Sequence, residues 1–207
     1  EADYTVKAVI VATGVHPKEL NIPGEKEFRN KGVSYCTVCD GPVFGGKIVA
    51  IVGGGNSALE SGLMMADIAS NVYMLNKNPE FKGDTILLDK LKTKNNVEFL
   101  YNAKTSQITG EQFVTGLKYG EGGSEKELKL DGVFVHIGML PNSGVVPDDV
   151  QKNTYGEIIV DKNCQTNVPG LYAAGDVTDI PFKQIVMAAA QGTCALLSAV
   201  QYLNKTK

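Results

Sequence analysis

The sequence is poor in histidine, cysteine and tryptophan, and it has no large excess of charge of either sign. Among its 207 residues there are no tryptophans, two histidines and four cysteines. Its 20 lysines and arginines are balanced by 23 aspartates and glutamates, for a formal net charge of −3. Binding to nucleic acid or to an anionic membrane surface calls for a basic patch, which this balance does not supply. We therefore expect neither nucleic acid nor a membrane among the partners.

Long apolar runs are missing as well. The longest, 48–52 and 185–190, are far shorter than the roughly 18 residues of a membrane span. The chain opens on Glu1-Ala2-Asp3 without an initiator methionine or a signal peptide, so we expect it to begin inside a longer, cytoplasmic protein. Four cysteines in a chain of this length do not make the disulfide framework of a small secreted protein.

Metal ligands at regular spacing are also missing. His16 and His136 lie far apart in the sequence, and Cys164 and Cys194 are isolated from other cysteines. A zinc site needs four ligands at characteristic short spacings. We therefore expect these four residues to pack in the core or to lie at the surface, and we expect no metal site.

The sequence does contain two cysteines separated by two residues. Cys36 and Cys39 can bridge reversibly, and this spacing often lowers the pKa of one thiol. The alternative, half of a zinc site, lacks its further ligands, so the pair predicts redox chemistry. Asp40 follows directly. Its carboxyl group can protonate a departing thiolate or can simply hold the turn at Gly41-Pro42, and position alone does not decide between these roles.

A glycine-rich turn begins fourteen residues after the second cysteine. It lies between a β-branched run at 47–52 and a helical pattern at 56–68, and it satisfies G-x-G-x-x-A. Glycines at these positions permit the tight turn and let the backbone approach a pyrophosphate. A turn that serves only packing is the alternative. The predicted dinucleotide site comprises Gly53, Gly54, Gly55, Asn56, Ser57 and Ala58.

The end of the next strand normally distinguishes NAD from NADP. An acidic residue there binds the ribose hydroxyls, whereas arginines bind a 2′-phosphate, and this chain has neither. Asn76 suits ribose hydroxyls and Lys77 suits a phosphate, so NADH and NADPH both stay open, with the balance toward NADH. Two polar turn residues are the alternative. Glu60, on the first helical turn, either faces the nicotinamide or is a solvated residue that favours the helix dipole.

The rest of the pattern alternates strands with helices, which indicates an α/β fold with a parallel sheet. A polar linker is expected at 17–32 and an antiparallel meander at 105–131. Helices are predicted at 56–68, 84–92 and 184–203. Strands are predicted at 7–11, 47–52, 71–75, 97–100, 133–137, 158–161 and 171–174.

With these residues in hand, the chain resembles the low-molecular-weight thioredoxin reductase family and the reductase module of alkyl hydroperoxide reductase flavoproteins. The matching segments follow family order along nearly the whole chain. They are 11–14, 35–42, 53–58, 137–138 with 141–142, 173–177 and 183–184.

The resemblance implies two Rossmann-like, three-layer nucleotide-binding domains of the FAD/NAD(P)-linked disulfide reductase type. Residues 23–134 would form the NAD(P) domain that carries the cysteines. Residues 1–22 and 135–207 would form a discontinuous and incomplete FAD domain that lacks its N-terminal βαβ unit. The flavin would contact Thr13, Gly14, Gly175, Asp176, Lys183, Gln184 and Ile185.

The implied activity is FAD-dependent reduction of disulfides by NADH or NADPH in a homodimer. Electrons would pass by way of the flavin to the Cys36–Cys39 disulfide and on to thioredoxin, a glutaredoxin-like protein or a peroxiredoxin system. By resemblance Cys39 faces the flavin, Cys36 attacks the partner and Asp40 supplies a proton. The alternative is a flavin-free fragment that binds NAD(P)H without turning over by itself, because the missing βαβ unit is a core element of its sheet.

Overall fold

The computed structural model describes residues 4–206, which form two compact units. Unit 1 is built from the two ends of the chain, with boundaries at Pro17 and Met139. Unit 2 is the continuous stretch Lys18–Gly138 between them. The assignment of FAD to one unit and NAD(P) to the other stays a prediction.

Unit 2 is organised around a five-stranded sheet in which every neighbouring pair is parallel. The central strand is a β-branched run with Val49, Ala50 and Ile51 wholly buried, as expected for a strand covered on both faces. The strand order is β3-β10-β4-β5-β6, with bounds β3 Val33–Ser34, β10 Gly132–Val135, β4 Ile48–Val52, β5 Asn71–Leu75 and β6 Val97–Leu100.

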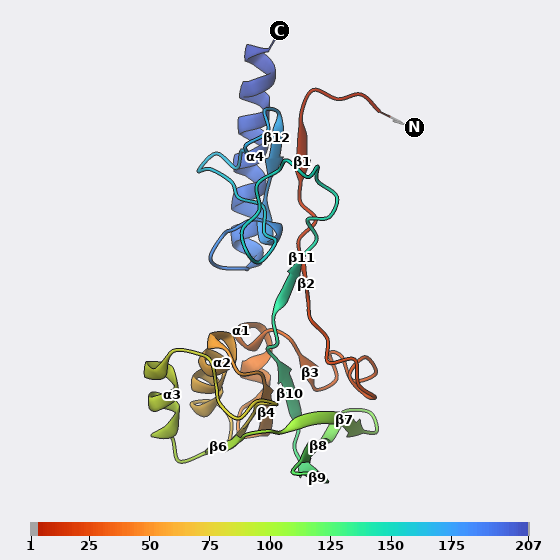
Figure 1. The fold of residues 1–207 in the computed structure, drawn as a ribbon, viewed down its shortest axis with the longest axis vertical. Coiled ribbons are helices and arrows are strands. Elements are labelled where there is room, and N and C mark those ends of the chain that lie inside the picture. Colours follow the sequence, from red (N-terminus) through yellow and green to blue (C-terminus); the bar gives the residue numbers. More distant parts are fainter. Residues whose placement is uncertain (1–3, 207) are drawn as a thin grey trace. The chain divides into compact units, whose positions relative to one another are not determined.

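Two cores lie on the two faces of this sheet, because successive side chains of a strand point to opposite sides. Val49 and Ile51 pack with helices α2 (Asn56–Ala66) and α3 (Thr85–Lys92), which Figure 1 shows on one side of the sheet. Ala50 and Val52 pack with the antiparallel sheet on the other face. That sheet has the order β7-β8-β9, with bounds Lys104–Gly110, Val114–Glu121 and Ser124–Lys129.

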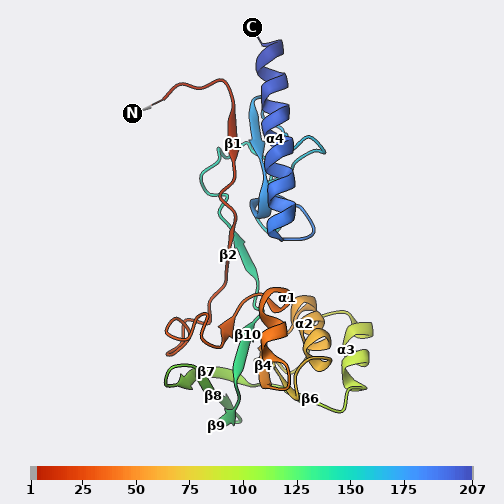
Figure 2. The same ribbon diagram turned by 180° about the vertical axis from the view of Figure 1, so that it is seen from behind.

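Unit 1 contains two short ladders and one long helix. β1 (Val9–Val11) pairs in parallel with β12 (Leu171–Ala173), and β2 (Val15–Pro17) pairs antiparallel with β11 (Met139–Pro141). The helix α4 (Ile185–Lys205) runs alongside β12, as both Figure 1 and Figure 2 show. A 3₁₀ turn, η2 (Gly175–Val177), follows β12 and contacts α4.

The structure differs from the predicted elements at three places. The stretch 158–161 is not a strand, and Ile158 makes only isolated bridges to Lys152 and Thr178. The β2–β11 ribbon went unpredicted, because each strand is three residues long and carries no clear alternation. Beside the cysteines the chain forms a short helix α1 (Thr37–Asp40) and a 3₁₀ turn η1 (Gly41–Phe44) where only a turn was expected.

Helix α4 joins the apolar stretch at 185–190 to further apolar residues in one continuous helix of 21 residues. Its best 18-residue window has a mean hydropathy of 1.3, so by length and composition alone it is long and apolar enough to cross a membrane. One such helix is weak evidence, because a core helix of a soluble protein passes the same test. The absence of a membrane partner therefore stays a prediction.

Candidate active site

The two cysteines of the Cys-x-x-Cys motif are joined in a disulfide, with their Cα atoms 5.3 Å apart. Cys36 is half-buried and caps α1, and Cys39 lies exposed within that helix. The Cys39 backbone N–H donates to Cys36 Sγ at 3.2 Å. Because an N–H donor at a helix start stabilises negative charge on sulfur, the geometry favours Cys36 as the thiolate of the reduced pair.

Asp40 is tied to the motif through Ser34, the last residue of β3. The Ser34 hydroxyl donates to Asp40 Oδ2 at 2.5 Å, and the Cys36 N–H donates to Ser34 Oγ at 3.1 Å. Ser34 is buried, so the sheet fixes the position of the Asp40 carboxyl group. Sequence reasoning singled out Asp40 and missed Ser34. The available signal was a hydroxyl residue at a strand end two positions before the first cysteine.

His136 joins the disulfide helix to the glycine-rich turn. Its Nε2 atom lies 2.8 Å from Thr37 Oγ1 and 2.9 Å from Ser61 Oγ, and the Thr37 hydroxyl donates to Ser61 at 2.9 Å. Thr37 lies between the two cysteines, and Ser61 belongs to α2. Burial lowers the pKa of His136 to about 4, so the imidazole is neutral at physiological pH. The sequence offered no sign that this histidine touches the motif.

The glycine-rich turn has the geometry of an anion site. Gly53 has φ +155°, and a Cβ added there would lie 2.2 Å from the His136 carbonyl oxygen. A Cβ at Gly55 would meet nothing within 4 Å, so the chain is open at that point. Ala58 is wholly buried where helix and strand pack closely. Helix α2 begins directly after Gly55, and the N–H groups at the start of a helix favour a phosphate.

The other residues predicted to bind the dinucleotide differ in whether their side chains are exposed or already hydrogen-bonded within the protein. Ser57 and Glu60 are exposed on α2. The Asn56 side chain is bound to Asp84, donating to Oδ2 at 3.0 Å and accepting the Asp84 N–H at 2.7 Å. A Cβ at Gly54 would lie 2.8 Å from the Asn76 amide, so this glycine lies against the end of β5.

Asn76 and Lys77, the two residues expected to distinguish NADH from NADPH, differ in burial. Asn76 is buried and closes its own turn, donating to the Glu80 carbonyl at 2.6 Å and accepting the Asn78 N–H at 3.1 Å. Lys77 is exposed. Because the Asn76 amide already serves the fold, the expected balance toward NADH lacks support.

A cavity of about 580 Å³ opens beside Asp40 in unit 2. Its walls combine apolar side chains with charged ones, which are Lys31, Lys47, Asp40 and Asp131. Val43 lines the cavity, and both it and Val38 of α1 have largely exposed side chains. An apolar, partly charged hollow therefore lies next to the disulfide helix.

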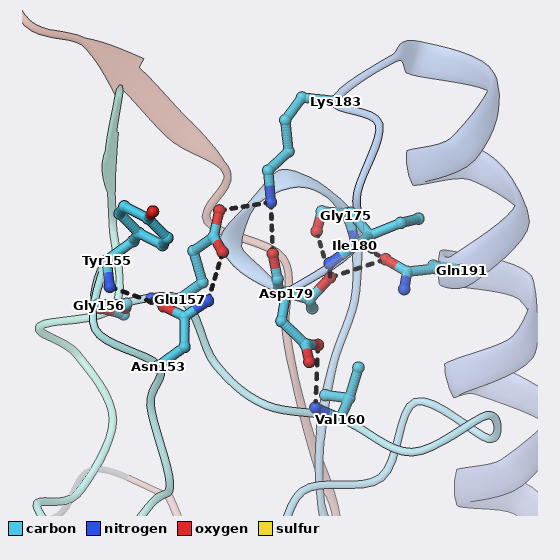
Figure 3. Close-up of polar contacts among 12 residues, drawn as sticks. Asn153, Tyr155, Gly156, Glu157, Val160, Gly175, Asp179, Ile180, Lys183 and Gln191 are labelled. Carbon is cyan, nitrogen blue, oxygen red and sulfur yellow. Dashed lines mark hydrogen bonds and ion pairs between the residues drawn. The ribbon is translucent and has the colours of Figure 1, made fainter. Parts of the chain in front are cut away.

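The predicted flavin residues of unit 1 include one unpaired carboxylate oxygen. Among residues 4–206, the buried Asp176 Oδ1 has no hydrogen-bond partner. Gly175, with φ +78°, donates its N–H to Gln191 Oε1 at 2.8 Å. Lys183 is held by Glu157 at 2.8 Å and by the Thr178 carbonyl at 2.5 Å (Figure 3). A buried acceptor beside a glycine of positive φ fits a hydroxyl-bearing cofactor such as the ribityl chain of FAD.

The remaining flavin candidates lie at element ends. The Thr13 hydroxyl donates to the Asn142 carbonyl at 2.8 Å, and the Asn142 amide donates back to the Thr13 carbonyl at 2.8 Å. Gly14 has φ +67°, in the left-handed region that favours glycine. Gln184 immediately precedes α4, and Ile185 is the most exposed large apolar side chain described, at 89%.

The part of the chain that the structure describes contains no group of three or more His, Cys, Asp or Glu side chains arranged to hold a metal ion. His16 lies in unit 1, with Nδ1 2.7 Å from Asn142 Oδ1.

Comparisons with protein families, with curated proteins and with solved structures agree on one family. Residues 1–192 match the family described as pyridine nucleotide-disulphide oxidoreductase. One component of the alkyl hydroperoxide reductase of Escherichia coli (strain K12) is 46% identical over 204 residues, covering 97% of this chain and 39% of that protein. A Bacillus subtilis (strain 168) protein named NADH dehydrogenase is 48% identical over 199 residues, covering 95% of this chain and 39% of its own length.

A solved structure extends the likeness to three dimensions. The thioredoxin reductase of Streptococcus pyogenes MGAS5005 aligns with a TM-score of 0.90 at 32% identity, covering 96% of this chain and 66% of the other. The predicted α/β, Rossmann-like fold of the FAD/NAD(P)-linked disulfide reductase type is thus confirmed. The chain spans only 39% of the length of the curated relatives it matches.

Proposed function

The chain belongs to the pyridine nucleotide-disulphide oxidoreductase family, and on that premise we propose that it takes electrons from NADH or NADPH, with FAD as cofactor, to reduce the Cys36–Cys39 disulfide. The reduced pair then reduces a disulfide in a small redox protein. Thioredoxin, a glutaredoxin-like protein and a peroxiredoxin are the candidates. The names of the similar proteins, thioredoxin reductase and alkyl hydroperoxide reductase, support this class of partner.

One observation carries the proposal. The disulfide helix α1 and the glycine-rich turn belong to the same unit and are linked by the contacts of Thr37, Ser61 and His136. An isolated disulfide or an isolated glycine turn has many explanations. Here the disulfide helix contacts α2, the helix that begins at the predicted dinucleotide-binding turn. This arrangement supports one pathway of two-electron transfer from a nicotinamide dinucleotide to the disulfide.

The residues that would hold each cofactor differ in kind. Backbone N–H groups at the start of α2, with the open approach at Gly55, suit the pyrophosphate of a nicotinamide dinucleotide. Asp176 would accept a hydroxyl of the flavin, beside the backbone of Gly175. A flavin held by these residues would supply two-electron chemistry between the nicotinamide and the disulfide.

Reduction of the disulfide consumes two electrons and two protons and yields the Cys36 and Cys39 thiols. The Cys39 N–H favours the thiolate at Cys36, which makes that sulfur the nucleophile toward a partner disulfide. The attack forms a mixed disulfide between Cys36 and the partner and breaks the partner S–S bond, and Cys39 then displaces the second partner sulfur and restores the Cys36–Cys39 disulfide. The departing thiolate needs a proton. Asp40, fixed by Ser34 next to the motif, is the group that would supply it.

The cavity beside Asp40 supports docking of a protein partner. Its volume of about 580 Å³ lies within the usual range for small-molecule pockets, so it has room for side chains of a partner. The exposed Val38 and Val43 would supply the apolar contact around it. We place the reaction in the cytoplasm and infer a homodimer, as the resemblance implies.

The test is disulfide turnover. The chain, supplied with FAD and NADH or NADPH, should reduce a disulfide reagent and oxidised thioredoxin, and it should be yellow after gel filtration. Asp176→Ala should weaken flavin retention, whereas Asp179→Ala, which loses only its contact with the Val160 N–H, serves as a matched control. Robust turnover in a preparation free of flavin would contradict the proposed pathway.

A second candidate function is a flavin-free module that binds NAD(P)H without turning over alone. The observation in its favour is that the only parallel ladder in the described part of unit 1 is β1 with β12, while α4 leaves Ile185 and Val186 exposed. A colourless protein that still binds NADH and never reduces its disulfide would favour this candidate.

A further inference from the structure

Unit 1 contains two cysteines that the proposed pathway does not use. Cys164 and Cys194 lie thirty residues apart in the sequence and are both free thiols. Cys164 is buried at 2% exposure, and Cys194 is half-buried on α4. They share one cluster, in which Cys164 packs with Ala195 and Ala199 of α4.

Each of the two thiols donates a hydrogen bond to a backbone carbonyl close in sequence to the other cysteine. Cys164 Sγ donates to the Gln191 carbonyl at 3.5 Å, one helical turn before Cys194. Cys194 Sγ donates to the Lys162 carbonyl at 3.4 Å, two residues before Cys164. Each sulfur therefore points into the segment that carries the other. Burial as the main cause, together with contact with the Cys194 thiol, raises the pKa of Cys164 to about 12.

The turn that carries Cys164 is built to hold it in place. Asp161 Oδ1 accepts the N–H groups of Asn163 and Gln165 at 2.8 and 2.9 Å, and the Asp161 carbonyl accepts the Cys164 N–H at 2.9 Å. Cys164 itself has φ +61°, a left-handed conformation that few residues other than glycine adopt. This backbone directs the sulfur toward α4 rather than toward solvent.

We propose that Cys164 and Cys194 are a second redox pair, which closes into a disulfide joining the 161–165 turn to α4 when the protein meets a small-molecule disulfide. Cys194 reacts first, because it is the more accessible sulfur. Its thiolate attacks the reagent R–S–S–R, forms a mixed disulfide and releases RS⁻, which takes up the proton lost by Cys194. Cys164 then displaces the second RS⁻ in the same way. The balance is two protein thiols and one R–S–S–R giving one protein disulfide and two RSH.

Peptide mapping tests the pair directly, with glutathione disulfide as the oxidant. Trypsin cuts after Lys162, Lys183 and Lys205, so the two cysteines fall on separate peptides, 163–183 and 184–205. Cys36 and Cys39 share the peptide 32–47, which serves as an internal reference for complete oxidation. After alkylation without reduction, the two peptides should appear joined, with the loss of two further thiols per chain, and dithiothreitol should separate them.

Variants of each pair distinguish this disulfide from other outcomes. Cys164→Ala should stop at a stable mixed disulfide of Cys194 with glutathione. A Cys36→Ser, Cys39→Ser double variant should still close the second pair, because the two pairs react independently. In this double variant the oxidised chain should also melt at a higher temperature than the reduced chain, a shift that adding Cys194→Ser abolishes.

Two results in the unmodified chain would overturn the proposal. One is that Cys194 carries glutathione while Cys164 stays a free thiol. The other is that both remain thiols after peptide 32–47 is fully oxidised. Neither result depends on flavin, nicotinamide or turnover, so a failure here is separate from a failure of the proposed reductase.

Discussion

The two units bury their apolar surface to very different degrees. In unit 2 the sheet is covered on both faces, and its central strand is almost wholly shielded from solvent. In unit 1, by contrast, α4 buries Ala195 and Ala199 against β12 but leaves Val186 and Leu197 exposed at 72% and 58%. Continuous sequence thus provides unit 2 with both of its covering layers, whereas the described part of unit 1 provides fewer partners for its own helix.

The two cysteine pairs also differ in how their members are brought together. The cysteines of the pair in unit 2 are three positions apart in the sequence, at the start of the short helix α1, and Cys39 is exposed. The pair in unit 1 is brought together only by tertiary packing. The first was evident from spacing, and the second was not.

The largest expected effect separates the two pairs by activity. Cys36→Ser or Cys39→Ser should reduce disulfide turnover to background, because either change removes the acceptor of two electrons. Nicotinamide binding, measured by fluorescence titration, should persist, since neither sulfur is part of the glycine turn. Cys194→Ser in unit 1 is the control and should turn over normally. Reductase activity retained in both active-site variants would show that the chemistry lies elsewhere.

The second-largest expected effect is a loss of stability when Gly53, the first glycine of the turn, is replaced. Gly53→Ala would drive a methyl group into the His136 carbonyl at 2.2 Å and require a strained φ of +155°. We expect a loss of about 3 kcal/mol in the free energy of unfolding of unit 2, measured by urea denaturation. Gly144→Ala in unit 1, where a Cβ meets nothing within 4 Å, is the matched control. Equal stability of the two variants would contradict the close packing at Gly53.

The titration of His136 should make unit 2 sensitive to acid. Its pKa is lowered from 6.5 to about 4 in the folded state, so the unfolded chain binds the proton more tightly. The resulting stability is present above pH 6.5 and is lost as pH falls toward 4, by about 3 kcal/mol in total. His136→Gln should flatten this part of the stability profile, whereas His16→Gln in unit 1 should leave it in place. An unchanged profile in His136→Gln would assign the acid sensitivity to other groups.

The smallest effect concerns nucleotide affinity. Gly55→Leu should leave the fold intact, because its backbone is extended and a side chain there meets open space. The side chain should nevertheless obstruct the pyrophosphate and weaken binding about tenfold or more, which corresponds to roughly 1.4 kcal/mol. Calorimetry with NADH and NADPH would measure it, with Gly120→Ala as a control at another open glycine. Undiminished affinity would mean that the turn serves packing alone.

Local patterns predicted the elements of unit 2 well. The run at 47–52, the helical spacing at 56–68 and the apolar stretch at 71–75 correspond to β4, α2 and β5 with small differences at their ends. These elements are long and strongly periodic, so neighbouring residues alone determine them. The prediction of a strand at 158–161 was wrong, because Ile158 is buried between irregular segments rather than in a β-ladder.

The redox motif and the glycine turn could be predicted from the amino-acid sequence, because each depends on residues a few positions apart. The α/β class followed from the alternation of strand and helix patterns along the chain. The side chains that surround the disulfide, in contrast, are known only from the tertiary structure. His136 contacts Thr37 across 99 residues, and Cys164 reaches the helix of Cys194 across 27, at Gln191. Spacing along the chain carries no information about such pairs. They follow from the strand order and from the helices that the buried apolar faces require.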